Sequence, residues 1–436
     1  MARWIAEWHP DNPTFWQNTG RKVARRNLIF SILAEHLGFT VWTLWSIVAA
    51  QMGAYAFSTD QLFWLIALPN LIGSVLRVPY TFGPARFGGR NFTVVSALLL
   101  IIPAVLLGVA VSNPATPYWM FLVIAALAGF GGGNFASSMA NITYFYPREK
   151  QGVALGLNAA GGNIGVSSVQ LVIPLVIGAF GLAAAGWFWI PFIVLAAACA
   201  WFFMDNLTSA KASPREQMAV AGKAQTWIMS FLYVGTFGSF IGYSTAFPLL
   251  SKSLFPGSPW AVVAFAGPLV GSLIRPVGGW LADRFGGAPV TLWNFAAMGG
   301  GVLLVWLGSV SGNFWLFFLA FQLLFLTSGI GNGSTYRMIP AIFQAKAVAE
   351  RGTDEAALLY GKRQASAAIG IISAVGALGG FLINRAFGMS FAATGSPSLA
   401  FAAFGIFYLA CVGVTWWCYT RTVGVTRAPS LAYARV

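Results

Sequence analysis

Two arginines, Arg77 and Arg275, stand inside long apolar stretches of the chain. A charge at the centre of a membrane-spanning helix costs about 3 kcal/mol, so such a residue usually faces a cavity or a partner. A guanidinium group suits a small planar oxyanion, which it binds through paired hydrogen bonds. Acidic residues are nearly absent from the apolar stretches. The two arginines therefore predict a binding site for a small anion.

One acidic residue, Glu35, and its neighbour His36 lie in the first apolar stretch. Two interpretations of Glu35 stay open. Either it forms a structural salt bridge with one of the arginines, or it takes up a proton when an arriving anion weakens the effect of the arginines on its carboxylate. His36 is either a packing residue or part of the same proton site. The second interpretation makes protons a possible co-substrate.

Membrane-spanning helices must position these residues. The chain has 436 residues, of which 58% are hydrophobic and 8% charged, whereas soluble domains hold about 25% charged residues. A spanning helix takes about 20 apolar residues, so this length holds about 12 spans. The net charge of +14 comes from basic residues dispersed in short loops. That pattern indicates a protein of the lipid bilayer with no nucleic-acid partner.

Apolar runs predict six spans, a polar linker and six further spans. The spans lie near 28–53, 62–82, 92–111, 118–145, 151–180, 184–204, 226–252, 260–281, 290–309, 314–343, 360–387 and 399–420. We expect a cytoplasmic N-terminal arm (1–27), an N-terminal six-helix bundle (28–204), a cytoplasmic linker (205–225), a C-terminal six-helix bundle (226–420) and a cytoplasmic tail (421–436).

Lysine and arginine accumulate in the arm, in alternate loops and in the tail. By the positive-inside rule, both termini are then cytoplasmic, which requires an even number of spans. The N-terminus lacks the apolar core of a signal peptide, so we expect the arm to stay attached. The prediction is a multi-pass protein of a bacterial inner (plasma) membrane.

The two halves repeat. The segment from Arg77 to Gly89 lines up with the segment from Arg275 to Gly287, at an offset of 275 − 77 = 198 residues. The same offset relates three further pairs: Gly131-Gly-Gly-Asn134 with Gly329-Ile-Gly-Asn332, Phe39 with Phe237, and Glu35 with Tyr233. Duplication about an axis along the membrane normal is typical of transporters whose substrate site lies near the midplane. We therefore predict an all-α membrane protein with 12 transmembrane helices in two pseudo-symmetric six-helix bundles, the major facilitator fold.

Glycines gather in several predicted spans, where small residues let helix backbones approach and slide. Close packing in a static bundle explains them equally well. The glycines assigned to gating or helix packing are Gly131, Gly132, Gly161, Gly165, Gly329 and Gly331.

The stretch from Gly278 to Gly286 resembles the loop motif that follows the second and eighth spans of the major facilitator superfamily. The resemblance implies gating and interhelix contacts for Asp283 and Arg284. In the first half Ala85 stands where the second half has Asp283.

Three glycine-rich segments closely resemble the nitrate/nitrite porter family of that superfamily. They are Gly129 to Pro147, with the sequence Gly-Phe-Gly-Gly-Gly-Asn-Phe-Ala-Ser-Ser, Gly152 to Ser167, and Gly329 to Pro340. The resemblance covers nearly the whole chain and implies a nitrate site with Arg77 and Arg275 as the anion-binding pair. It implies that further substrate contacts come from Phe135, Asn163, Tyr233 and Phe237, and from Phe39 through the repeat.

We interpret the chain as a secondary active transporter of nitrate or nitrite, favoured as a nitrate/proton symporter and acting as a monomer. A nitrate/nitrite antiporter stays open, as does a carrier of phosphate or a small carboxylate, and so does a membrane sensor that binds the anion without moving it. An enzyme is not indicated, because the sequence has no nucleophile and base constellation, metal set or cofactor fingerprint. We assign packing roles to Cys199, Cys411 and Cys418.

Overall fold

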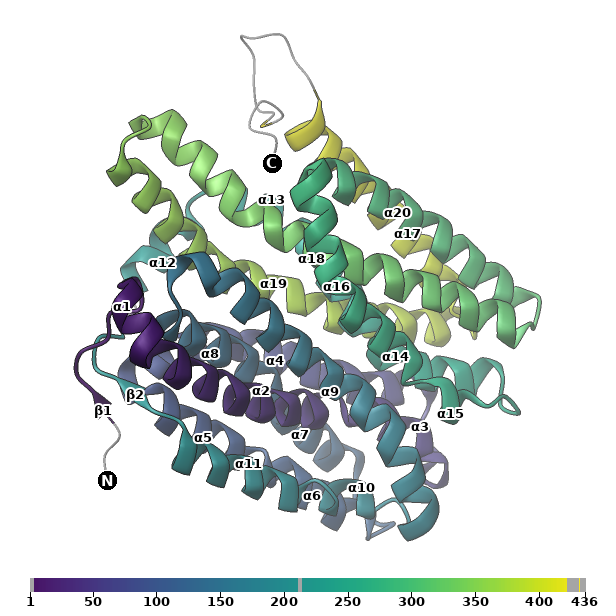
Figure 1. The fold of residues 1–436 in the computed structure, drawn as a ribbon. Coiled ribbons are helices and arrows are strands. Elements are labelled where there is room, and N and C mark those ends of the chain that lie inside the picture. The colour runs from purple at the N-terminus through teal and green to yellow at the C-terminus, as the bar shows by residue number, and fades with distance from the viewer. Residues whose placement is uncertain (1–3, 211–213, 422–430, 432–436) are drawn as a thin grey trace. The chain divides into compact units, whose positions relative to one another are not determined.

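The computed structural model describes residues 4–210, 214–421 and 431, and nearly all of this part is helical (Figure 1). The predicted cytoplasmic tail lies outside the described residues, apart from Arg421 and Leu431. Three residues of the predicted linker, 211–213, also lie outside them.

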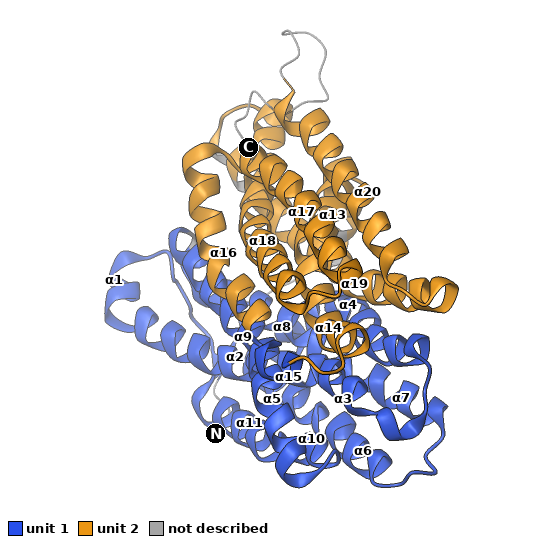
Figure 2. Ribbon diagram, turned by 90° about the vertical axis from the view of Figure 1, so that its right-hand side faces the viewer, with its two compact units in different colours: residues 1–212, 259–265 blue, residues 213–258, 266–436 orange. Residues whose placement is uncertain are grey.

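The described chain forms two compact units, which are coloured separately in Figure 2. Unit 1 is Met1–Ala212 with Pro259–Phe265, and unit 2 is Ser213–Ser258 with Ala266–Val436.

Unit 1 holds two short strands and the helices of the first half. Its elements are β1 (Trp4–Ile5), α1 (Pro13–Phe15), η1 (Trp16–Gly20), α2 (Arg21–Thr43), α3 (Trp45–Gln51), η2 (Gly53–Tyr55), α4 (Thr59–Phe87), α5 (Gly89–Leu99), α6 (Ile101–Val111), α7 (Tyr118–Ala128), α8 (Phe130–Phe145), η3 (Arg148–Lys150), α9 (Gln151–Phe180), α10 (Ala184–Trp187), α11 (Ile190–Phe203), β2 (Asn206–Leu207) and α15 (Trp260–Val263).

Unit 2 is helical in the residues described. Its elements are α12 (Pro214–Ala221), α13 (Ala224–Tyr233), η4 (Val234–Gly238), α14 (Ser239–Leu254), α16 (Ala266–Phe285), α17 (Gly287–Val310), α18 (Phe314–Arg351), α19 (Glu355–Thr394), α20 (Ser398–Thr415) and η5 (Trp416–Thr420).

Within the described residues, 11 helices are long and apolar enough to cross a membrane. They correspond to eleven of the predicted spans. The remaining prediction, the seventh span, falls on α13, η4 and α14, which follow one another without a break from Ala224 to Leu254. This continuous helical segment holds many serine, threonine and glycine residues, which lower its hydropathy. In its middle, η4 replaces the α-helical hydrogen-bond pattern with a π turn. The predicted all-α membrane fold is confirmed.

Several helices run beyond the predicted span ends. The first begins at Arg21, α18 continues to Arg351 and α19 begins at Glu355. These extensions carry alanine together with charged residues, which favour helix but do not count as apolar. Reading apolar runs therefore finds the part of each helix suited to lipid and misses its polar ends.

The repeat is visible in the backbone. Gly88 ends α4 with φ 86°, and Gly286, at the same 198-residue offset, ends α16 with φ 89°. Glycine adopts such a positive φ without strain, because it has no Cβ atom. In each unit the helix that ends there packs on one glycine-rich helix, α4 on α8 and α16 on α18.

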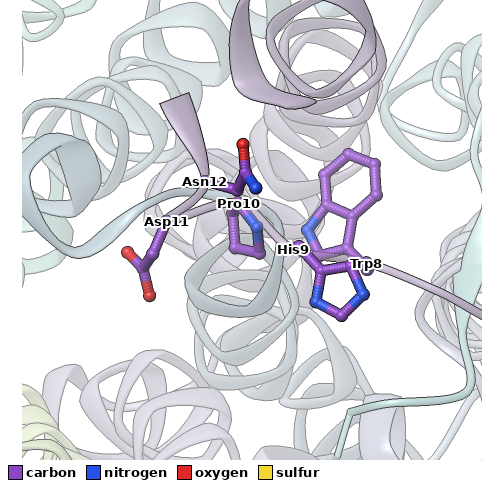
Figure 3. A pocket seen from close by; sticks show the side chains of 5 residues that line it. All are labelled: Trp8, His9, Pro10, Asp11 and Asn12. Carbon is purple, nitrogen blue, oxygen red and sulfur yellow. The ribbon is translucent and has the colours of Figure 1, made fainter. Parts of the chain in front are cut away.

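From Trp4 onward, the N-terminal arm packs as part of unit 1. Strand β1 pairs in parallel with β2. Trp8 and Trp16 pack in a small core with Phe145 and Leu207. Beside this core a hollow of about 360 Å³ is lined by residues 8–12 (Figure 3). In Figure 3 the Asp11 carboxylate and the His9 ring lie apart and do not converge.

Candidate functional site

Arg77 lies on α4 and is fully buried in unit 1. Its Nε donates a hydrogen bond of 3.2 Å to the carbonyl oxygen of Gly132 on α8. Its guanidinium carbon lies 4.5 Å from the centre of the Phe135 ring and 5.4 Å from that of Trp42. Cation–π attraction and a carbonyl acceptor thus hold a charge that the apolar surroundings would otherwise penalise.

The aromatic rings beside Arg77 also contact one another. Phe39 of α2 packs edge-on against Trp42, at 5.2 Å between ring centres, and against Phe135, at 6.1 Å. The indole N–H of Trp42 donates a 2.8 Å hydrogen bond to the carbonyl oxygen of Pro69. The structure therefore brings Phe39, Arg77 and Phe135 together, and it adds Trp42, which was not among the predicted site residues.

Glycine makes room for this indole. A methyl group at Gly73 of α4 or at Gly132 of α8 would overlap the Trp42 ring. At Gly131 a methyl group would overlap the carbonyl of Gly38 on α2. These glycines therefore act as packing sites for α2, α4 and α8, and they set where the guanidinium group lies.

Arg275 lies on α16 and is buried in unit 2. Its guanidinium carbon lies 5.4 Å from the centre of the Tyr336 ring on α18. Tyr336 lies 6.3 Å from Tyr233, whose ring stacks on Phe237 at 5.5 Å. Within the described residues, no hydrogen-bond acceptor reaches the buried Nη1 of Arg275. The second arginine therefore also lies in an aromatic cluster, and Tyr336 is the member that sequence reasoning missed.

Asn163 lies on α9 and is fully buried. In the described part of the chain neither its Oδ1 nor its Nδ2 has a hydrogen-bond partner. A buried amide without partners is costly, so its donor and acceptor are suited to a ligand.

Glu35 lies on α2 and is 1% exposed. Asn158 of α9 donates a 2.7 Å hydrogen bond from Nδ2 to its Oε2. The next residue, His36, donates from Nδ1 to the carbonyl oxygen of Gly161, at 3.1 Å. Both residues are therefore held by α9, and Asn158 is a partner that the sequence did not indicate.

Glycines of α9 make this contact possible. A methyl group at Gly161 would overlap Ile32, one at Gly162 would overlap the Glu35 carboxylate, and one at Gly165 would overlap the carbonyl of His36. In unit 2, Gly376 of α19 contacts the ring of Tyr233 in the same way. Glu35 and Tyr233, which the 198-residue offset pairs, thus occupy equivalent positions against a glycine.

Comparison with known proteins decides the family. The family model of the Major Facilitator Superfamily matches residues 29–354. The chain is a member of this superfamily. Over 96% of its length it is 46% identical to the nitrate/nitrite transporter NarU of Salmonella typhimurium, covering 96% of that protein. It is 37% identical to the probable nitrate/nitrite antiporter NarK2 of Thermus thermophilus, covering 96% of this chain and 97% of the relative.

A more distant relative is the nitrite extrusion protein of Bacillus subtilis, 30% identical over 88% of this chain and 91% of the relative. The chain therefore belongs to the nitrate/nitrite porter family within the superfamily.

In this family member the loop motif of the second half carries an interhelix ion pair. Asp283 of α16 pairs with Nε of Arg337 on α18, and both side chains are more than half exposed. An exposed pair of this kind contributes little stability. Arg284 lies against its neighbours Trp280 and Phe285, at 5.7 and 5.4 Å from the ring centres.

The remaining glycines of the porter assigned to packing lie on α18. A methyl group at Gly329 would overlap the carbonyl of Gly271, and one at Gly331 would overlap the amide of Asn294. Among the residues described, no group of three or more His, Cys, Asp or Glu side chains could hold a metal ion.

Overpacking at Gly162 gives a stability prediction for the porter. We expect Gly162→Ala to lower the free energy of unfolding by about 1–3 kcal/mol, because the methyl group forces apart buried atoms. Gly156 lies on the same helix with open space around it, so Gly156→Ala should be neutral or raise stability by about 0.5–1 kcal/mol. Thermal unfolding of both purified variants in one detergent checks this. Equal melting temperatures would contradict the close contact.

Proposed function

We propose that the protein transports nitrate and nitrite across the bacterial inner membrane by alternating access, with nitrate entry coupled to protons. The observation that carries the anion assignment is the buried Arg77 among Phe39, Trp42 and Phe135, in a chain similar over 96% of its length to proteins named nitrate/nitrite transporters. We further propose that it acts as a monomer with both termini in the cytoplasm.

The chemistry of the arginine clusters supports a small, weakly hydrated anion. A guanidinium fork offers two parallel N–H donors, which match two oxygens of a planar nitrate or nitrite. Aromatic ring edges carry partial positive charge and add a dry, favourable wall. We propose that Arg77 and Arg275 supply these donors, with Asn163, Tyr233 and Phe237 as further substrate contacts.

Proton coupling rests on Glu35. Two buried arginines without an acid would make the empty transporter carry two positive charges through its closed state, which is unfavourable. An ionised Glu35 lowers that charge on the empty return, and a protonated Glu35 accompanies the bound anion. His36 belongs to the same proposed proton site, because it is held by the neighbouring turn of α9.

Antiport is the second candidate. The relative from Thermus thermophilus is named a probable nitrate/nitrite antiporter and is 37% identical. An exchanger needs no acid, because it never returns empty.

Counterflow in proteoliposomes tests the proposal. Vesicles loaded with nitrate or nitrite should take up labelled nitrate against its gradient. Vesicles without internal anion should accumulate nitrate only when the outside is more acidic than the inside, so that protons flow inward. Uptake that requires internal nitrite and ignores the pH gradient would establish antiport instead. No anion movement in any arm would remove the transport assignment.

Selectivity gives a separate prediction. Nitrite should compete with labelled nitrate, whereas about a tenfold excess of phosphate or sulfate should leave uptake unchanged. Strongly hydrated anions give up more hydration free energy when they enter a dry site. Initial rates in the same proteoliposomes, at one pH and with matched ionic strength, measure this. Inhibition by phosphate equal to that by nitrite would favour a carrier of another anion.

A further inference from the structure

A buried chain of four polar side chains links α2, α8 and α9 in unit 1. Nδ2 of Asn158 donates to Oε2 of Glu35 at 2.7 Å and to Oγ of Ser138 at 2.6 Å. Oγ of Ser138 lies 2.8 Å from Oγ of Ser31. The four side chains are at most 6% exposed, and Asn158 is completely buried. Asn158 is therefore the junction between the carboxylate and a pair of hydroxyl groups.

Within this chain of hydrogen bonds the carboxylate accepts from a neutral group, the amide of Asn158. Helix α9 contains no charged or titratable residue, and α8 contributes only Tyr144. On α2 itself the titratable neighbour is His36, with Arg21, Lys22, Arg25 and Arg26 at the helix start. The other helices that pack on α2 carry Asp60, Arg77, Tyr80 and Arg86 on α4, Arg90 on α5, Tyr118 on α7 and Cys199 on α11.

An amide can serve both protonation states of a carboxyl group. An ionised carboxylate only accepts hydrogen bonds, and Nδ2 of Asn158 supplies one. A protonated carboxyl donates one, and an amide turned by half a rotation would present Oδ1 to receive it. In the present arrangement Oδ1 is buried, and no donor among the described residues reaches it. Oδ1 of Asn158 is therefore available to accept the hydrogen bond that a protonated Glu35 would donate.

The hydroxyl groups of Ser138 and Ser31 can reverse their hydrogen bond when the Asn158 amide turns over. While Nδ2 faces Ser138, this hydroxyl accepts from Asn158 and donates to Ser31. Once Oδ1 faces it, Ser138 donates to Asn158 and accepts from Ser31. Either serine oxygen can be the donor in their 2.8 Å contact, so both arrangements use the positions observed. The two arrangements differ in the proton on Glu35, the orientation of the Asn158 amide and the directions of the hydrogen bonds.

We propose that Asn158 is the positioning residue of the Glu35 proton site, and that its amide turns over, with reversal of the Ser138–Ser31 hydrogen bond, when Glu35 gains or loses its proton. This inference rests on the proposed proton coupling through Glu35. It extends that proposal to residues on two further helices, which set the pH at which the transporter takes up its proton.

The pH profile of gradient-driven nitrate uptake tests this role. Asn158→Leu keeps the side-chain volume but removes the donor to the carboxylate, so Glu35 keeps its proton at higher pH. The pH of half-maximal uptake should rise by about one unit or more, which is a tenfold change in proton activity. In Asn158→Ser the shorter side chain cannot reach the carboxylate, so this variant should give the same shift. It replaces Asn158→Leu in the test if the leucine variant does not fold.

Asn384 provides the matched control. It is a completely buried asparagine of α19 whose Nδ2 also makes two hydrogen bonds, to Thr245 at 2.8 Å and to the carbonyl of Gly380 at 2.7 Å. Asn384→Leu should leave the pH of half-maximal uptake unchanged. A general effect of losing a buried amide would shift both profiles.

The outcomes separate this inference from the proposed function. A shift in the Asn158 variants alone, absent from Asn384→Leu, supports the positioning role. An unshifted Asn158 profile, with gradient-driven uptake abolished in Glu35→Gln, overturns the role of Asn158 and leaves Glu35 as the coupling group. Suppose instead that Glu35→Gln keeps gradient-driven uptake and that adding Asn158→Leu to this variant still shifts the pH profile of uptake. The proton then binds elsewhere, and neither Glu35 as the coupling group nor Asn158 as its positioning residue stands.

Discussion

Arg77→Lys and Arg275→Lys are each expected to lower nitrate uptake by about 10- to 100-fold, while the protein stays folded. A lysine keeps the charge but offers a compact ammonium in place of the planar fork, so two charge-assisted hydrogen bonds to one anion become at best one. The effect is measured as initial uptake of labelled nitrate into proteoliposomes, together with nitrate affinity in detergent.

Arg90→Lys is the control for this pair. Arg90 is also buried in unit 1 and lies 4.5 Å from the ring of Trp201, but its guanidinium donates to Asn91 and it lies outside the proposed anion site. The Arg90→Lys variant should therefore take up nitrate at the rate of the unchanged protein. Near-normal uptake in either of the first two lysine variants would point to a general electropositive cavity and against paired hydrogen bonds.

Glu35→Gln is expected to lose nitrate accumulation driven by a pH gradient and to keep nitrate-for-nitrite exchange. Glutamine imitates the protonated acid permanently, so the loaded transporter still crosses but the empty one carries the uncompensated charge of the arginines. Both activities are measured in one proteoliposome preparation. The expected ratio of gradient-driven to exchange uptake falls by about tenfold or more, since each 1.4 kcal/mol in the return step is a factor of ten.

Glu350→Gln is the control carboxyl. Glu350 lies 3.8 Å from Lys223 and is about half exposed, so its neutralisation should leave both activities unchanged. Intact gradient-driven accumulation in Glu35→Gln would refute Glu35 as the coupling group. Loss of exchange together with accumulation would favour the structural salt bridge that the sequence left open.

The sequence predicted the fold well because its strongest signals are local. Apolar length marks each span, and the Arg-Phe-Gly-Gly turns at Arg86 and Arg284 mark the repeat. Gly88 and Gly286 end their helices with nearly the same positive φ, as the repeat leads one to expect. The weaker signal was the seventh span, where polar residues and the π turn η4 lower the apolar character of the helix.

The partners of the site residues were less predictable. Asn158 was missed because only the rotation of α9 against α2 decides which of its asparagines, Asn158 or Asn163, meets Glu35. Trp42 and Tyr336 were missed for a different reason. The chain has 37 phenylalanines, 18 tryptophans and 12 tyrosines, so an aromatic residue carries no signal until the packing places it beside a guanidinium group.

The two halves differ where the repeat pairs Glu35 with Tyr233. The first copy keeps a regular helix there and carries the acid, whereas the second carries a phenol followed at once by the π turn η4. A π turn accommodates an extra residue and often marks a functional position. The two copies thus differ at the same point, one in its side-chain chemistry and the other in its backbone. The halves are no longer interchangeable: a protein built from two first halves would hold two acids and no π turn at this position.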